Sequence, residues 1–126
     1  EGRVTFAGAR RDIPAVMAAL DVFVLTSRHE GFGRVVAEAM ASARPIVVTD
    51  EGALPELVVP ETCGLAARPA DAADFARQIL RQLEDGDAAR ARGDRAAQRA
   101  SSFDAAATGR RVRELYERLA LSRART

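Results

Sequence analysis

The sequence contains no lysine and no tryptophan, and it has only one cysteine and one histidine in 126 residues. The single cysteine, Cys63, excludes a disulfide bond within the chain and favours a reducing compartment such as the cytoplasm. We interpret Cys63 as an inert, small apolar residue. The sequence also lacks an apolar run long enough to span a bilayer and an N-terminal targeting segment. Because it begins at Glu1 and leads at once into an apolar segment, we expect it to be a piece of a longer protein.

Charge of either sign is not in excess, since the formal net charge is +1. A balance of this kind gives no electrostatic reason for capture of nucleic acid or a membrane surface. The arginine-rich stretch 90–99 contains Asp94 and no aromatic residue, which favours a solvated helix face over a nucleic-acid site. We therefore expect no nucleic-acid partner.

Apolar runs of strand length alternate with segments of helical periodicity along the chain. Such alternation predicts an α/β fold with a Rossmann-like parallel sheet flanked by helices. Ligands of these sheets bind at the carboxyl ends of the strands, where loops 26–33 and 50–56 are expected. The predicted strands are 3–7, 21–27, 46–49 and 64–67, and the predicted helices are 13–20, 33–43, 71–84, 87–100 and 104–120.

Capping and periodicity give these helices further detail. Asp12 and Asp71 are predicted N-caps. Helix 87–100 has no large apolar residue, so we expect it to be solvated, with a weak point at Gly93. Residues 122–126 are expected to fray. The predicted inward faces are Val36, Ala39, Met40 and Ala43 in the second helix and Val112, Leu115, Tyr116 and Leu119 in the last.

Glu30 and Glu38 flank the start of the predicted helix 33–43. At a helical rise of ~1.5 Å per residue, their carboxylates would lie on the order of 10 Å apart. Gly31 and Gly33 let a ligand approach the backbone between them, and a helix N-terminus binds phosphate well. The pattern indicates a ligand that is anionic in the middle and rich in hydroxyls at both ends, such as a nucleotide-sugar.

Each of these residues also has a purely structural interpretation. Glutamate near a helix N-terminus is favourable in any protein, and glycines can serve a tight turn alone. Phe32 suits packing as well as ligand contact, and His29 is interpreted as a loop residue beside the site rather than a general base. Pro55-Glu56 fits the start of a helix as well as a ligand role.

The run Ser27-x-x-Glu30-Gly31-Phe32-Gly33-x-Val35-x-x-Glu38-Ala39-Met40-Ala41 resembles the signature of retaining family 4 glycosyltransferases of the GT-B fold. The resemblance continues through the last helix with Tyr116 and covers nearly the whole chain. Flanking segments that resemble the family in the same order are Val4-x-Phe6-x-Gly8, Asp21-Val22-Phe23-Val24-Leu25, Arg44-Pro45-Ile46-Val47 and Gly52-x-x-Pro55-Glu56-Leu57-Val58.

The resemblance implies a hexosyltransferase in which Glu30, as the catalytic residue, contacts the donor hexose and Glu38 holds the ribose hydroxyls. The donor would be a UDP-, GDP- or ADP-sugar, transferred with retention, and the nucleobase would lie near Ala9 and Arg10. No metal or other cofactor is expected, because the helix dipole and basic side chains can neutralise the departing diphosphate. The remaining donor-binding positions implied are Gly31 and the backbone amides of Phe32, Gly33, Arg34 and Val35.

The same resemblance implies that residues 1–126 are part of a C-terminal nucleotide-sugar-binding domain. The N-terminal acceptor domain, the first strands of this lobe and the family's Gly-Arg and Lys diphosphate clamp would lie outside the sequence. The family's Gly-Gly in the second loop is Glu51-Gly52 here. We expect the chain alone to lack transferase activity and to self-associate through the open edge of strand 21–27. Association of the parent with the inner membrane face would arise from its other half.

Two alternatives remain open at this stage. One is a lobe that binds a nucleotide-sugar without catalysis, or an inactive remnant of an enzyme. The other is a nucleotide-sugar epimerase of similar architecture, which would need more carboxylates and histidines than the sequence offers.

Overall fold

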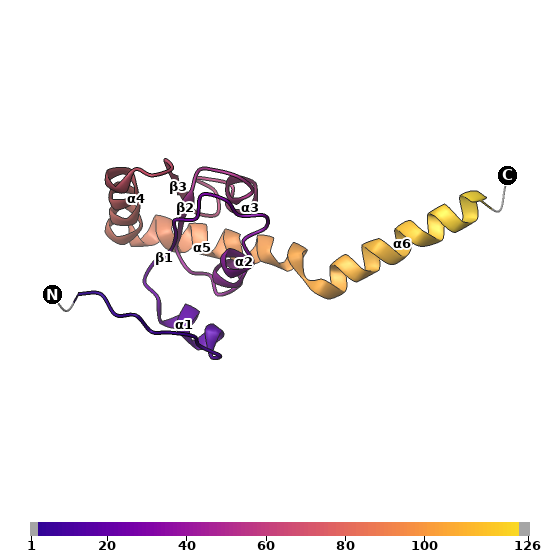
Figure 1. Cartoon of the computed structure of the whole chain (residues 1–126), viewed down its shortest axis with the longest axis horizontal. Helices are drawn as coiled ribbons and strands as arrows, with labels where there is room; N and C mark the ends of the chain where they lie inside the picture. Colours follow the sequence, from indigo (N-terminus) through magenta and orange to yellow (C-terminus); the bar gives the residue numbers. More distant parts are fainter. Residues whose placement is uncertain (1–2, 124–126) are drawn as a thin grey trace.

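The computed structural model of the chain describes residues 3–123. Within this range the chain forms the expected α/β fold, in which helices flank a parallel sheet (Figure 1). The sheet consists of β1 (Phe23–Leu25), β2 (Ile46–Thr49) and β3 (Leu65–Ala67). The helices are α1 (Ile13–Ala19), α2 (Arg34–Ala41), α3 (Leu54–Val58), α4 (Ala72–Glu84), α5 (Gly86–Ala100) and α6 (Ala105–Arg123), with a 3-10 turn, η1 (Ser101–Phe103), between the last two.

The strand β2 lies at the centre of the sheet, in the order β1-β2-β3. All four of its residues are buried, as expected for an uninterrupted apolar strand covered on both faces. Its side chains alternate between two clusters. Ile46 and Val48 join the cluster that contains α2 and α3, whereas Val47 packs with Phe75 of α4. The predicted strands 46–49 and 64–67 are therefore confirmed, and β1 is shorter than the predicted 21–27.

The helix α2 packs against both the sheet and α5. Val36, Ala39 and Met40 are fully buried, which confirms the predicted face, and Ala43 beyond the helix is half-buried. On the other side of the sheet, α4 begins after Asp71, whose carboxylate accepts a hydrogen bond from the amide of Asp74 at 2.9 Å. This N-cap was predicted correctly.

The prediction that α5 is a solvated helix with a weak point at Gly93 is wrong. Ala89, Arg92, Gly93 and Ala96 are buried. A Cβ atom at Gly93 would lie 2.4 Å from the carbonyl oxygen of Ala43, so glycine is what permits this close approach. Small residues therefore form most of the packing face of α5. This face could not be predicted from large apolar side chains, because α5 has none.

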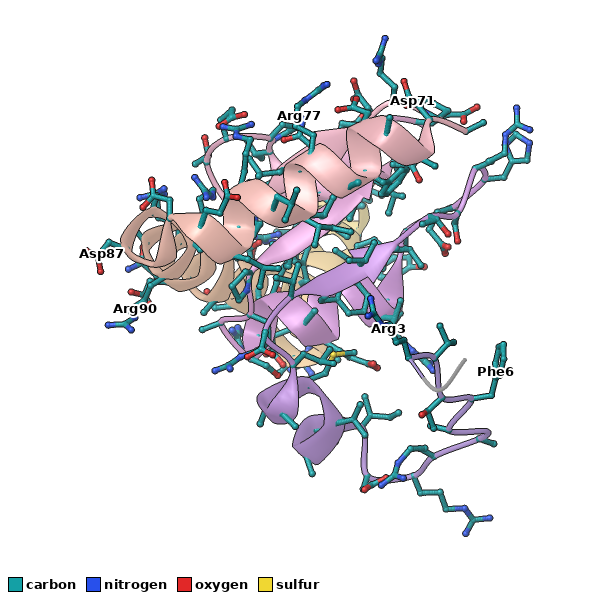
Figure 2. The ribbon with its side chains drawn as sticks, turned by 90° about the vertical axis from the view of Figure 1, so that its left-hand side faces the viewer. Arg3, Phe6, Asp71, Arg77, Asp87 and Arg90 are labelled. Carbon is teal, nitrogen blue, oxygen red and sulfur yellow. The ribbon has the colours of Figure 1, made fainter. Side chains whose placement is uncertain are left out.

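The predicted strand 3–7 does not form. Its residues are exposed, with Phe6 95% and Val4 76% accessible, and Figure 2 shows Phe6 pointing away from the rest of the chain. An isolated strand has no partner for its backbone N–H and C=O groups. No neighbouring strand pairs with this segment among the described residues, so its β-like pattern is not sufficient.

Two further predictions also need correction. The side chain of Asp12 does not cap α1, because its carboxylate is held by the guanidinium of Arg10. The long helix α6 projects from the body of the fold in Figure 1. Its predicted inward residues are exposed: Val112 46%, Leu115 47%, Tyr116 69% and Leu119 54%. The predicted frayed segment 122–126 overlaps the end of α6 at 122–123, and 124–126 lie outside the described residues.

Candidate functional site

Two loops meet at the carboxyl ends of β1 and β2. The first loop, residues 26–33, connects β1 to α2, and the second loop, residues 50–53, connects β2 to α3. A Cβ atom at Gly52 would lie 3.4 Å from the carbonyl oxygen of Glu30, so the two loop backbones lie close together. Because neighbouring parallel strands end at the same edge, the topology brings these loops together. The second loop is shorter than the predicted 50–56, since α3 already begins at Leu54.

Gly33 determines how the first loop enters α2. Its φ of +76° lies in the left-handed region, which glycine adopts without steric cost. A Cβ atom there would come within 3.0 Å of the Leu54 side chain and 3.3 Å of the Glu30 side chain. Gly31 has open space around its Cα, so only Gly33 is required by the local geometry.

The N-terminus of α2 presents backbone amides toward this loop. The carbonyl of Gly33 accepts hydrogen bonds from the amides of Val36, at 2.8 Å, and Ala37, at 3.2 Å. The amides of Arg34 and Val35 precede these donors and belong to the first turn, where amides have no partner within the helix. Such amides, at the positive end of the helix dipole, favour an anionic ligand.

The two candidate carboxylates lie on either side of this turn. Glu30 is half-buried against Gly33 and Gly52, whereas Glu38 lies on α2 with 40% of its side chain exposed. The Nε atom of Arg34 lies 3.6 Å from Oε1 of Glu38. This is an exposed ion pair of small energetic value, so Glu38 remains accessible to a ligand.

Glu38 borders two hollows of the surface. One, of about 460 Å³, extends along α2 from Phe32 and Arg34 to η1. The other, of about 300 Å³, lies between α2 and α1 and is lined by Ile13, Pro14 and Met17. A third hollow, of about 280 Å³, lies where the first loop, α3 and the end of α5 meet. The candidate site is therefore a set of shallow, open depressions around the first loop and α2.

Ala9 and Arg10 lie ahead of α1 and are exposed. Nε of Arg10 donates to Oδ1 of Asp12 at 2.8 Å, and this hydrogen bond raises the pKa of Arg10 and lowers the pKa of Asp12. The hydrogen bonds described for Arg10 go to Asp12 and not to the first loop. The nucleobase role of Ala9 and Arg10 stays a prediction.

Within residues 3–123, no group of three or more His, Cys, Asp or Glu side chains is placed to hold a metal ion. None of the helices described there is long and apolar enough to cross a bilayer.

Arg99 and Phe103 also contact this region, and sequence reasoning missed them. Nε of Arg99 donates to the carbonyl of Leu57 at 2.9 Å, and its Nη2 donates to the carbonyl of Glu56 at 2.8 Å. The ring of Phe103 meets the ring of Phe32 edge-on, with centroids 5.6 Å apart. Their sequence separation from the first loop is large, and no local motif marks them.

A family model described as glycosyl transferases group 1 matches residues 1–85. The chain belongs to this family. It is 34% identical over 106 residues to a D-inositol 3-phosphate glycosyltransferase of Corynebacterium kroppenstedtii, covering 84% of this chain and 24% of that protein. It is 36% identical over 118 residues to an N-acetylgalactosaminyltransferase of Campylobacter jejuni that acts on N,N'-diacetylbacillosaminyl-diphospho-undecaprenol, covering 94% of this chain and 31% of that protein.

Two solved structures share the fold. The structure of HepE from Anabaena in complex with UDP and glucose has a TM-score of 0.87 and 34% sequence identity, and the match covers 93% of this chain and 32% of that one. A sucrose-phosphate synthase from Thermosynechococcus elongatus has a TM-score of 0.78 and 34% identity, covering 85% of this chain and 27% of that one. This group 1 chain thus spans about a quarter to a third of the length of these relatives. The comparisons do not favour the epimerase alternative.

Proposed function

We propose that this chain is the donor-binding part of a retaining, family 4 glycosyltransferase that transfers a hexosyl group from a nucleoside diphosphate sugar. One observation carries the proposal: the left-handed turn at Gly33 places the half-buried Glu30 directly before the free amides of α2, with Glu38 farther along the same helix. The structures of HepE with UDP, and with UDP-glucose, support a uridine nucleotide as the first donor to test.

The proposed donor lies along the first loop and α2. Its diphosphate accepts hydrogen bonds from amides of Gly33, Arg34 and Val35, where the helix dipole offsets negative charge. The carboxylate of Glu30 accepts hydrogen bonds from hexose hydroxyls, and that of Glu38 accepts them from the ribose. Gly31 and Phe32 contribute backbone contacts to the sugar.

Catalysis in this proposal depends on stabilising two charges that develop in the transition state. The departing diphosphate gains negative charge, which the free amides of α2 stabilise more strongly than in the ground state. The hexose ring gains positive charge, which the nearby carboxylate of Glu30 stabilises. Transfer needs an acceptor site, which the proposal assigns to a domain of the longer parent, and it needs no metal or other cofactor.

Calorimetric titration of the full-length protein with UDP-, GDP- and ADP-glucose tests donor binding. We expect one of the three to bind, and binding of none of them would contradict the proposal. Retention is tested separately by NMR of the anomeric proton. In the sugar that hydrolysis of the donor releases, this proton is recorded before the free sugar mutarotates. A product with the anomeric configuration of the donor supports a retaining reaction, whereas an inverted product contradicts it.

The alternative from a different class is a lobe that binds a nucleotide-sugar without transferring it. The full-length protein would then bind a donor but would neither hydrolyse it nor transfer its sugar. Hydrolysis of a bound donor in the absence of acceptor, measured as release of the nucleoside diphosphate, separates this lobe from an enzyme.

A further inference from the structure

Arg99, in the last turn of α5, joins α5 to the short helix α3. Its guanidinium donates to the carbonyls of Glu56 and Leu57, which belong to the last turn of α3. Carbonyls in the last turn of a helix have no partner within that helix. Arg99 therefore satisfies two of them, and it holds α3 and the adjoining second loop in place.

Phe103, in η1, joins the same region to the first loop. The guanidinium carbon of Arg99 lies 5.7 Å from the centroid of the Phe103 ring, within the range of a cation–π contact. The Phe103 ring then meets Phe32 edge-on at an interplanar angle of 77°, a favourable aromatic geometry. Phe32 itself remains 49% exposed.

The first loop needs such a contact because Phe32 lies between Gly31 and Gly33. Glycine restricts the backbone less than any other residue, so a loop built on two of them loses more freedom when it is ordered. The Phe103 ring limits this freedom from outside the loop. Arg99 and Phe103 together fix the relative position of the two loops that meet at Glu30 and Gly52.

We propose that Arg99 and Phe103 are positioning residues that hold the first loop in the geometry needed to recognise the sugar half of the donor. The inference rests on the proposed function, in which the first loop contacts the hexose and Glu38 contacts the ribose. In this proposal the pair acts through its contacts with Phe32 and α3 rather than on the reacting atoms of the donor. Loss of the pair should therefore affect the sugar half of the ligand and spare the nucleotide half.

The test compares UDP-glucose with UDP as calorimetric ligands of the full-length protein. Because small misplacements of a site have large effects, Arg99→Ala and Phe103→Ala should weaken UDP-glucose binding roughly tenfold. UDP binding should change by less than about twofold, since all its proposed contacts except the Gly33 amide are to α2 and Glu38. A general loss of stability would instead weaken the binding of both ligands to the same extent.

The chain offers a matched control on the same helix. Arg95 also donates from Nε to a backbone carbonyl, that of Thr62, at 2.7 Å, but it has no described hydrogen bond to α3 or the first loop. Arg95→Ala should leave the ratio of UDP-glucose to UDP affinity unchanged. Phe103→Tyr keeps the ring and should restore that ratio.

Hydrogen exchange supplies a readout that needs no ligand. The peptide containing residues 29–34 should exchange faster in Phe103→Ala and Arg99→Ala than in Phe103→Tyr and Arg95→Ala. Equal exchange in all four variants would overturn the proposal, as would equal affinity ratios in Arg99→Ala and Arg95→Ala. If the unaltered protein binds no nucleotide-sugar, the proposed function fails, and with it the assignment to sugar recognition. The exchange data then decide alone whether the pair holds the loop.

Discussion

Gly33 is the residue whose backbone conformation the candidate site depends on most. A Cβ atom there would be strained by the φ of +76° and would require the Leu54 side chain, 3.0 Å away, to shift. Gly33→Ala should therefore lower the free energy of unfolding by roughly 1–2 kcal/mol and weaken donor binding. Gly31→Ala is the matched control, since nothing lies within 4 Å of the new methyl group. Urea unfolding of both variants checks this, and equal stability of the two would refute it.

Asp74 makes the stability of the fold sensitive to acid. The residue is 3% exposed, and its carboxylate accepts a hydrogen bond from the amide of Arg68 at 2.9 Å and lies close to Arg77 and Gln78. The Arg68 hydrogen bond is the largest of the effects that lower the pKa of Asp74 from its ordinary 3.8. The folded protein therefore binds this proton less readily than the unfolded chain, so the stabilisation is complete above that value and disappears as the pH falls through the lowered pKa.

We predict that the urea midpoint of the unaltered protein falls more between pH 5 and pH 3 than that of Asp74→Asn. Asp94→Asn, which changes an exposed residue on α5, is the control and should follow the unaltered protein. A pH dependence that is the same in Asp74→Asn and Asp94→Asn would show that Asp74 is not the group responsible.

The parts of the site that could be predicted from the sequence are those formed by residues close together in the chain. A strand, a turn and a helix follow one another along the chain here, and this order predicts a glycine in the turn between Glu30 and Glu38. Gly33 is that glycine. The contacts of Arg99 and Phe103 could not be predicted, because they arise only when α5 crosses α2 and ends beside the first loop. The close approach of Gly52 to the Glu30 backbone likewise follows from adjacent parallel strands rather than from either loop alone.

At the scale of elements, the packing of α5 against the segment that follows α2 depends on Gly93. A methyl group there would lie 2.4 Å from the carbonyl oxygen of Ala43 and would force the helix away. Gly93→Ala should destabilise the protein by roughly 1–3 kcal/mol, even though alanine is the better helix former. Gly86→Ala, in the first turn of the same helix, meets nothing within 4 Å and is the control. Thermal unfolding that ranks Gly93→Ala at or above Gly86→Ala in stability would contradict this account.

The exposed face of α6 leads to a prediction for the chain 1–126. Because the Leu115 side chain is 47% exposed, Leu115→Ala should change stability by less than about 0.5 kcal/mol. Leu57→Ala, at a residue 4% exposed in the core, should cost roughly 2–5 kcal/mol. Urea unfolding measures both. A similar cost for the two variants would mean that α6 packs on the body of the fold.

These helices show what periodicity can and cannot predict. The stripe of Val36, Ala39 and Met40 correctly predicted a buried face, because the sheet and α5 cover it. The stripe that includes Leu115 is equally regular and correctly predicted an apolar face of α6. A stripe does not reveal which element covers it, and this one is exposed. The buried face of α5 consists largely of alanine and glycine, so it carries no hydrophobic stripe to detect. The apolar run of β2 was sufficient to predict a central strand, because such a strand needs only β-forming residues on both faces.

At the scale of the whole molecule, β1 lies at one edge of the sheet. A parallel edge strand presents unpaired backbone groups, which invite pairing with another chain. We predict that the chain 1–126, expressed alone, self-associates and shows no sugar transfer, because the proposed acceptor domain is not part of it. Light scattering and a transfer assay check these outcomes. A monomer in light scattering would contradict the first, and turnover by the purified chain would contradict the second.

The central claim is that Glu38 holds the ribose of a nucleoside diphosphate sugar bound at the start of α2. Its most direct test is calorimetric titration of UDP into the full-length protein and its Glu38→Ala variant, with Glu84→Ala, at an exposed position on α4, as the control. Loss of hydrogen bonds to a carboxylate should weaken binding by roughly tenfold to a hundredfold in Glu38→Ala, and Glu84→Ala should bind as the unaltered protein does. If Glu38→Ala binds UDP with unchanged affinity, the assignment of Glu38 to the ribose is wrong.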